Sequence, residues 1–474
     1  MATTAPAPTN PLIGTVPPSP AGPIDAAEQR GLPAPPWVRG PRALQVLRFT
    51  QRQHSFVFRA RREHGEVWRM HATIPGGPAV TAHPDHVRSL FTAKPEIAPS
   101  VTSESPIRPI VGPSSVLTAQ GARHMRQRKL LLPAFHGRSI AAYERAIEEA
   151  TRAELATWPV GEPFALAPRM QAITLDVIMS AIFGIEHAPE PGSPEDRLRR
   201  ATMGVLAASS KPWAQLGELA NTGRDEPVGL VKFGLGFLDR PTYELIAQRR
   251  RAGDLAERDD ILSMLLLATT EEGESLGDQE VRDELLTLVL AGHETTANQL
   301  AWTWERLVRA PEAHERLTAA VRGEAAPDGP TEAEEVEAVI QESMRVRPVV
   351  PIVGRRVQVP WRLGDYAVPA GTPVSTSILL VHHREDLYPE PYAFRPERWH
   401  GHRPGTYEWL PFGGGTRRCL GAALALAEMR IVLRAMAAGL DLEAAEPEAE
   451  RPLHRNVTMI PGRGGRVVLR GRRG

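Results

Sequence analysis

The sequence predicts a mainly α-helical protein with small β-sheets, an α+β class built around one long helix. Apolar residues recur at three- and four-residue spacing through most of residues 84–350, as helices that pack in a core require. Short alternating runs bounded by Pro and Gly are confined to residues 66–81, 351–380 and the C-terminal tail. Because neither an internal repeat nor a clear linker divides residues 38–474, we expect them to form a single domain.

The elements are expected in the following order. Residues 1–37 are rich in Pro and Ala and are expected to be a disordered leader. A helix over 41–63 precedes a β-hairpin with strands at 66–71 and 78–81. Further helices share a three- and four-residue apolar period and cover residues 139–155, 167–182, 243–251 and 278–309. The remainder comprises a β-meander over 351–380, an irregular coil over 387–411, a helix over 420–437 and strands at 455–460 and 465–469.

Composition limits the classes of partner. The 56 basic residues balance 56 acidic ones, so nothing favours binding to nucleic acid or to an anionic membrane. The most apolar internal stretch, residues 285–292, is far shorter than the ~20 residues of a membrane span, and no membrane anchor is expected. The single cysteine, Cys419, excludes an internal disulfide and favours the cytoplasm. We expect a cytoplasmic monomer.

Residues 411–421, PFGGGTRRCLG, carry the most specific signal. Glycines precede Cys419 and a helix is expected to follow it, so the helix N-terminus would favour the thiolate. A glycine-rich loop before a helix can also bind phosphate, but the G-x-x-x-x-G-K-[ST] pattern of a P-loop is absent. The segment matches F-x-x-G-x-R-x-C-x-G at every specified position. It resembles the haem loop of the cytochrome P450 family, and its details are similar to those of bacterial members.

The resemblance implies a P450 fold, with the long helix lying over a haem, and a role for each matched residue. Cys419 would be the axial thiolate ligand of iron in haem b, and donation from sulfur favours cleavage of the O–O bond. Arg417 would contact a haem propionate, and Phe412 would shield the sulfur. Gly421 would allow close packing under the ring.

A second signal is Ala-Gly-His-Glu-Thr-Thr at residues 291–296, within the long helix. From the residues alone, the hydroxyl of Thr295 would bond the preceding turn. The zinc motif H-E-x-x-H fails because Ala297 occupies the position of the second histidine. The resemblance implies that Gly292 opens a groove for O2, that Thr295 hydrogen-bonds O2, and that Glu294 relays protons through water.

Two further groups gain their meaning from position along the chain. Glu342 and Arg345, three apart on a helix, could be an ordinary surface ion pair. The resemblance makes them a structural triad with Arg398. His124 and Arg128, four apart, could be a solvated basic helix face. The resemblance makes them propionate contacts, with Arg355 as a third; Arg356 is an alternative for that position.

The resemblance also implies where substrate binds. The expected pocket is apolar and suits a small hydrophobic molecule such as a lipid or terpenoid. Its residues are Ile107, Ile110, Val111, Leu290, Val350, Ile352 and Met459.

The resulting hypothesis is a haem-thiolate monooxygenase that inserts one oxygen atom from O2 by hydroxylation or epoxidation, plausibly in secondary or lipid and terpenoid metabolism. The sequence holds no flavin or iron–sulfur segment, so we expect electrons from a separate ferredoxin and ferredoxin reductase. A peroxide-driven P450 is the alternative enzyme, although Glu294 and Thr295 argue against it. A haem module that senses gas or carries a ligand is the alternative outside enzymes.

Overall fold

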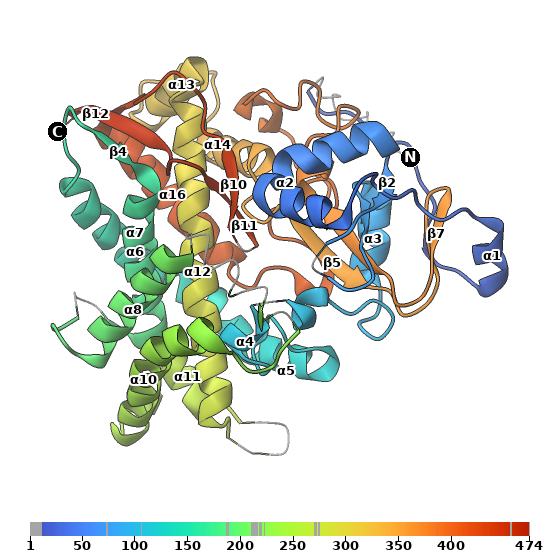
Figure 1. Cartoon of the computed structure of the whole chain (residues 1–474). Coiled ribbons are helices and arrows are strands. Elements are labelled where there is room, and N and C mark those ends of the chain that lie inside the picture. The colour runs from blue at the N-terminus through green and yellow to red at the C-terminus, as the bar shows by residue number, and fades with distance from the viewer. Residues whose placement is uncertain are drawn as a thin grey trace, which may run out of the picture.

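The structure of the protein, a computed structural model, describes residues 12–473 except 73, 106, 186–188, 210–216, 218–219, 222, 270–272, 274 and 456. Helix α12 (Asp278–Leu307) runs through the middle of the molecule (Figure 1). Helices gather on one side of it, and most of the sheet lies on the other together with the N-terminal region. The predicted class, mainly α with small β-sheets around one long helix, is confirmed.

The largest apolar core is built from α12 and the helices around it. These helices are α5 (Gly121–Leu131), α6 (Arg138–Ala156), α7 (Leu166–Phe183), α8 (Pro194–Ser209), α10 (Gly229–Arg251), α11 (Ile261–Leu267), α13 (Pro311–Val321), α14 (Glu332–Val346) and α16 (Ala422–Gly439). A capping box formed by Thr331 and Glu334 starts α14. The helices predicted over 139–155, 167–182 and 420–437 are confirmed, and residues 243–251 are the last part of the longer α10.

Helix α7 is long and apolar enough to cross a membrane, a longer apolar run than residues 285–292. It packs against α12 and α6, and 67% of it is buried inside the protein. Its apolar residues therefore belong to the core.

The second core lies beneath a four-stranded sheet in the order β2-β3-β8-β5. These strands are β2 (Val67–Arg69), β3 (Ala79–Thr81), β8 (Pro373–Ser377) and β5 (Ile352–Arg356). Only the β3–β8 pairing in this sheet is parallel. Helices α2 (Arg42–His64), α3 (Pro84–Thr92) and α15 (Ile378–Val381) flank it or connect to it, whereas α4 (Arg108–Val111) packs against α12. The predicted helix over 41–63 and the hairpin after it are confirmed.

Three smaller sheets complete the described part of the fold. One has the order β1-β6-β7, from β1 (Ala21–Pro23), β6 (Trp361–Leu363) and β7 (Tyr366–Val368). Another has the order β4-β12-β9, from β4 (Pro163–Ala165), β12 (Arg466–Arg472) and β9 (Leu440–Ala444). The third is a hairpin of β10 (Pro452–Arg455) and β11 (Thr458–Pro461). The single strand expected over 455–460 is therefore wrong, because the chain turns between Arg455 and Thr458.

The N-terminal segment also differs from its prediction. Residues 12–37 lie against the protein: β1 pairs with β6, and Asp25 caps the short helix α1 (Ala26–Gly31). The Gly14 N–H donates to the carbonyl of Leu387 at 2.8 Å. Proline-rich chain is already extended, so pairing with a strand edge satisfies its backbone at a small entropic cost. Disorder was thus the wrong expectation for residues 12–37, while residues 1–11 lie outside the described part of the chain.

Candidate active site

The loop before α16 folds tightly around its cysteine. The Cys419 N–H donates to the carbonyl of Phe412 at 2.9 Å, which closes the loop. Gly415 has a φ of 64°, and a Cβ there would lie 2.0 Å from the carbonyl oxygen of Phe91. Only glycine meets both conditions at this position. A Cβ at Gly421, by contrast, would meet no protein atom within 4 Å, so its expected packing under a ring stays a prediction.

The thiol of Cys419 is accessible although protein surrounds it on most sides, which places it in a recess. Burial raises its pKa, while the Gly421 N–H and the charges of Arg128 and Arg418 favour the thiolate. These groups supply the environment that a thiolate ligand of a metal requires.

The middle of α12 also faces open space. Residues 281–289 and 296–305 of this helix are buried, whereas Ala291 is exposed and both Leu290 and Thr295 are half-buried. The hydroxyl of Thr295 donates to the carbonyl of Ala291 at 2.8 Å, the local bond that threonine forms in helices. Gly292 lies on another face of the helix. A Cβ there would lie 2.8 Å from Cδ1 of Ile178 on α7, so the structure gives this glycine a helix-packing role.

Glu294, beside Thr295, is held by the β10–β11 hairpin. Its Oε1 accepts hydrogen bonds from Arg455 Nη2 at 2.7 Å, Arg455 Nε at 3.0 Å and Thr458 Oγ1 at 3.1 Å. The side chains of Glu294 and Arg455 are 13% and 10% exposed, so the ion pair is largely shielded from water. A carboxylate in this setting has a fixed direction.

Three arginines and a histidine from three segments meet near the cysteine loop. His124 and Arg128 come from α5, Arg355 from β5 and Arg417 from the loop. The pKa of His124 falls to about 4, because it is buried and Arg417, Arg128 and Arg355 lie nearby. Arg128 donates to the Arg418 carbonyl at 2.7 Å, and Arg355 lies over the ring of Phe91. Within the described residues, no carboxylate forms an ion pair with any of the three arginines or with His124.

Arg355, and not its neighbour, belongs to this cluster. Burial lowers the pKa of Arg355 to about 10, and burial, with a smaller contribution from the charge of Arg355, lowers the pKa of Arg417 to about 10 as well. Arg356 instead pairs with Glu104, at 2.7 Å from its Nε. The alternative that the sequence left open at this position is therefore not favoured by the geometry.

The predicted triad is assembled and completely buried. Arg345 donates to both oxygens of Glu342 at 2.8 Å, and Nε of Arg398 lies 3.1 Å from Glu342 Oε2. Burial alone would raise the pKa of Glu342, but the two guanidinium groups outweigh it and lower that pKa. Arg345 also donates to the carbonyls of Pro391 and Ala393, and thereby ties α14 to the coil that leads to the cysteine loop.

The expected pocket residues come from separate segments, as predicted. Met459 donates its N–H to the carbonyl of Val349 at 2.7 Å, so β11 lies beside the segment that carries Val350 and Ile352. The guanidinium of Arg282 on α12 donates to the carbonyl of Ile110, which places α4 beside the long helix. Most of the predicted side chains are half-buried, namely Ile107, Ile110, Leu290, Val350 and Ile352; Val111 and Met459 are fully buried.

Three site residues escaped the sequence analysis. Arg455 and Thr458 lie in the tail, where the turn was not recognised. Glu428 is a buried carboxyl on α16, hydrogen-bonded to Thr296, and burial raises its pKa well above the ordinary value. A lone acid in an otherwise apolar stretch, ALALAEM, was the available signal for Glu428.

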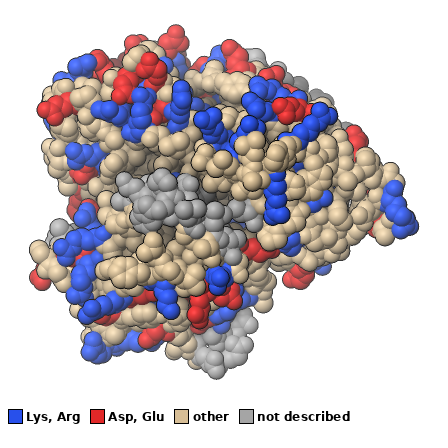
Figure 2. Space-filling view, in the orientation of Figure 1, with Lys and Arg blue, Asp and Glu red and all other residues tan. Residues whose placement is uncertain are grey.

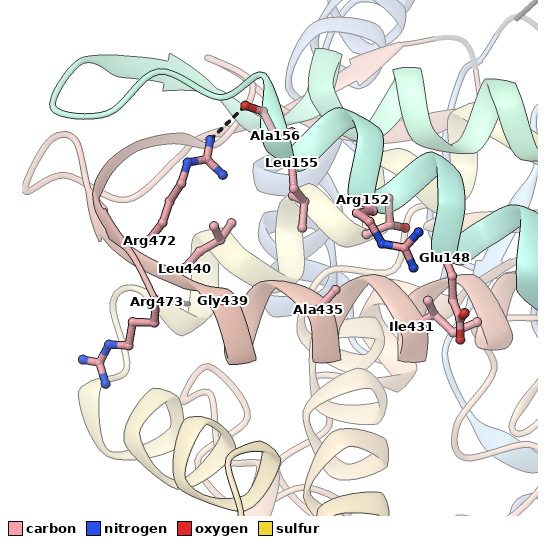
Figure 3. Close-up of a pocket in the computed structure, with 11 residues that line it drawn as sticks. Glu148, Arg152, Leu155, Ala156, Ile431, Ala435, Gly439, Leu440, Arg472 and Arg473 are labelled. Atoms are coloured by element: carbon pink, nitrogen blue, oxygen red, sulfur yellow. Dashed lines mark hydrogen bonds between the residues drawn. The ribbon is translucent and has the colours of Figure 1, made fainter.

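A separate groove of about 420 Å³ lies between α6 and α16 (Figure 3). Leu155, Ile431 and Leu440 contribute apolar surface, and Arg152 and Arg472 lie along it. None of the residues assigned to the site above lines this groove. Basic and acidic side chains are interspersed over the face of the molecule shown in Figure 2, and neither sign dominates it.

Comparison with known proteins decides the family. A model of the family described as cytochrome P450 matches residues 32–465. The chain belongs to the cytochrome P450 family. Two Mycobacterium tuberculosis proteins, provisionally named cytochrome P450 138 and cytochrome P450 137, are 38% and 37% identical to it. The first alignment covers 92% of this chain and 96% of the relative, and the second covers 93% and 90%.

Solved P450 structures share the fold. The retinoic acid-bound cyanobacterial CYP120A1 superposes with a TM-score of 0.77 at 23% identity, over 93% of this chain and 100% of that one. The heme domain of cytochrome P450DA gives 0.73 at 23% identity, over 93% and 98%. The predicted P450 fold is confirmed, and the protein is a P450 monooxygenase that binds haem b through a cysteine thiolate and uses O2.

The residues present fit a haem. Buried cationic groups without a carboxylate partner are unfavourable unless an anionic group meets them. The two carboxylates of a haem would satisfy the cluster of His124, Arg128, Arg355 and Arg417, and the accessible thiol of Cys419 supplies the soft ligand that iron takes in this family.

Proposed function

We propose that this P450 inserts one atom of O2 into a small hydrophobic substrate by hydroxylation or epoxidation, with electrons from a ferredoxin and its reductase. The observation that carries the proposal is the Glu294–Thr295 pair on α12, because an acid beside an alcohol can deliver the protons that O2 reduction consumes. A peroxide-driven enzyme receives its oxygen already reduced and protonated. Such an enzyme has no comparable need for the Glu294–Thr295 pair.

Cys419 is assigned as the thiolate ligand of the haem iron, and the haem supplies the oxygen-activating chemistry when bound. Arg128, Arg355, Arg417 and His124 would hold its propionates by charge-assisted hydrogen bonds. Phe412 would shield the sulfur from water. Glu342, Arg345 and Arg398 have a folding role, because they fix the coil on which the cysteine loop rests.

Thr295 and Glu294 are assigned to proton delivery on the distal side. The Thr295 hydroxyl now donates to Ala291, and a rotation about χ1 would redirect that proton into the open space beside α12. Glu294 would pass protons through water from its second oxygen, since its first is already occupied by Arg455 and Thr458.

The substrate is assigned by the chemistry of the pocket. The predicted lining is aliphatic. Two arginines on the elements that carry it already form ion pairs, Arg108 with Asp225 and Arg282 with Asp239. Aliphatic walls with paired charges favour a hydrophobic molecule, which fits a role in secondary or lipid and terpenoid metabolism.

The remaining assignments concern the protein as a whole. We assign residues 38–474 to one P450 domain, on which residues 12–37 dock, in a monomeric cytoplasmic enzyme. Arg126 and Arg418 are the candidate contacts for ferredoxin. Arg126 lies 2.5 Å from Glu280, whereas Arg418 is exposed and adjoins Cys419, so Arg418 is the stronger candidate.

The test begins with the spectrum of the dithionite-reduced protein under carbon monoxide. A thiolate-type Soret band is expected, and a band typical of histidine ligation would contradict the assignment of Cys419. Candidate hydrophobic substrates are then screened by the low- to high-spin shift of the ferric form. Product formation with ferredoxin, reductase and NADPH should exceed that with H2O2 alone. Equal rates would indicate a peroxide-driven enzyme, and haem binding without turnover would indicate a sensor or carrier.

A further inference from the structure

The tip of the β10–β11 hairpin contacts the acid of α12. Arg455 ends β10 and Thr458 begins β11, and the two are paired across the strands. Arg455 donates to one oxygen of Glu294, and the single hydroxyl proton of Thr458 is shared between that oxygen at 3.1 Å and the carbonyl of Arg455 at 2.9 Å. One carboxylate oxygen therefore takes every hydrogen bond that the described residues give to this carboxyl group.

The second oxygen of Glu294, Oε2, has a different environment. It has no hydrogen-bond partner among the described residues, and it is not among the buried polar atoms that lack a partner. It therefore retains contact with solvent-accessible space. A carboxylate anchored by one oxygen and open at the other has a defined direction for proton transfer.

The hairpin that supplies these donors is itself fixed to the rest of the site. The indole of Trp302, two turns further along α12, donates to the carbonyl of Met459 at 3.0 Å. Met459 in turn donates to Val349 in the segment after α14. The hairpin thus contacts α12 at two points, Glu294 and Trp302. These contacts fix the position of Arg455 along the helix axis, beside Glu294.

We propose that Arg455 is a positioning residue for proton delivery: it binds Glu294 through Oε1 so that Oε2 faces the water that carries protons to the distal side. The inference rests on the proposed role of Glu294. Thr458 supports the same oxygen, and Arg455 acts through Glu294 without contacting substrate or O2. Without Arg455 the carboxyl group of Glu294 would be free to rotate, and either oxygen could then face the water.

The experiment compares Arg455→Met, Arg455→Lys and Thr458→Val with Arg451→Met, a control on the same hairpin whose side chain is exposed. NADPH oxidation is measured in H2O and in D2O, with a plant-type ferredoxin and its reductase in excess and dodecanoic acid as the probe substrate. The carbon monoxide spectrum and Tm of each holoenzyme report haem ligation and folding independently of turnover.

Arg455→Met is expected to keep the thiolate spectrum, to slow NADPH oxidation by about tenfold and to increase its solvent isotope effect, a smaller effect than the ~10²-fold of a 1 Å misplacement because Thr458 still donates to Glu294. Arg455→Lys should recover most of the rate, and Arg451→Met should match the parent. A wild-type rate and isotope effect in Arg455→Met would overturn the proposal, even if Tm falls.

Epistasis separates this proposal from the function on which it rests. If Arg455 acts through Glu294, Glu294→Gln and the double variant Glu294→Gln/Arg455→Met should be equally slow. Losses that multiply would show that Arg455 acts independently and would overturn the proposal. A Glu294→Gln enzyme that oxidises NADPH normally would instead remove the proton role of Glu294 itself. Should Arg455→Met fail to bind haem, Thr458→Val, which removes the other donor to the same oxygen, is compared with Arg451→Met in its place and is expected to slow NADPH oxidation in the same direction.

Discussion

The indole Nε1 of Trp399 donates a hydrogen bond of 3.0 Å to Oε2 of Glu342. Glu342 has no exposed surface, so each donor lost leaves part of a buried charge unsatisfied. We expect Trp399→Phe to lower the free energy of unfolding by about 2 kcal/mol, the usual size of a hydrogen bond to a charged group. Urea unfolding followed by circular dichroism measures it.

Trp409→Phe is the matched control for this prediction. It also replaces an indole by a phenyl ring, but Trp409 donates to a neutral acceptor, the carbonyl of Gln341, at 3.1 Å. The expected loss is about 1 kcal/mol. If the two variants lose the same stability, the indole of Trp399 does not serve the charge on Glu342.

This relationship shows where sequence reasoning succeeds. The spacing of Glu342 and Arg345, with the motif around Arg398, predicts three residues that the structure brings together. The three residues match a family motif in which Glu and Arg are three apart on a helix and the second Arg lies in the coil that follows. The sequence also places Trp399 next to Arg398. Its hydrogen bond to Glu342, however, depends on the orientation of the indole in an irregular coil, and no sequence periodicity predicts that orientation.

The same distinction explains the residues that were missed. Arg455 reaches Glu294 across 161 positions of sequence, from the end of β10 in a region predicted as one strand. The O2 groove at Gly292 stays a prediction from its motif, but the contact of Gly292 with Ile178 is set by how two helices cross and could not be predicted. Helix periods and local motifs are visible in one sequence, but contacts between distant elements follow from packing.

Thr295→Ala should leave haem binding intact and uncouple NADPH use from product. Removal of the hydroxyl eliminates one donor on the distal side, while the bond to Ala291 that it loses is local and weak. We expect product per NADPH to fall by about tenfold, with a matching rise in H2O2; this is below the ~10²-fold low end of acid–base contributions because water can still supply protons to the distal side. Peroxide and NADPH assays on one sample measure this ratio, and unchanged coupling would remove Thr295 from proton delivery.

Cys419→Ser should abolish the thiolate-type carbon monoxide spectrum, because an alcohol does not replace the sulfur as an anionic donor at neutral pH. Haem itself is expected to remain associated in part, since the cationic cluster around Arg417 does not depend on the sulfur. Absorption spectra and the haem content after gel filtration give both quantities. Retention of the thiolate spectrum would contradict the ligand assignment.

Gly292→Ala distinguishes packing from an O2 groove. The new Cβ would lie 2.8 Å from Cδ1 of Ile178, and overpacking costs about 1–3 kcal/mol, offset by ~1 kcal/mol of helix propensity. A net loss of about 1 kcal/mol is expected. Ile178→Val removes the clashing methyl group, so adding Gly292→Ala to it should cost little. Altered O2 consumption at unchanged stability would instead support the groove.

Glu284 on α12 gives the protein a pH dependence of known sign. Its carboxyl group is completely buried, accepts the Val116 N–H at 2.8 Å through Oε1, and finds no partner for Oε2 among the residues that the structure describes. Burial raises its pKa from 4.5 to about 8, with smaller effects from Asp283, Glu280 and Arg123. The folded protein therefore keeps a proton that the unfolded chain has already lost at neutral pH.

It follows that the stability contributed by Glu284 is fully present below about pH 4.5 and is lost as the pH rises through about 8. Glu284→Gln preserves the shape and the acceptor for Val116 but cannot ionise. Its stability should therefore exceed that of the parent by an amount that grows from pH 5 to pH 8, reaching a few kcal/mol at about 1.4 kcal/mol per pKa unit. Urea unfolding at a series of pH values measures the difference, in which unchanged groups such as Glu428 cancel. Parallel stability curves for the two proteins would mean that Glu284 ionises equally in the folded and unfolded states.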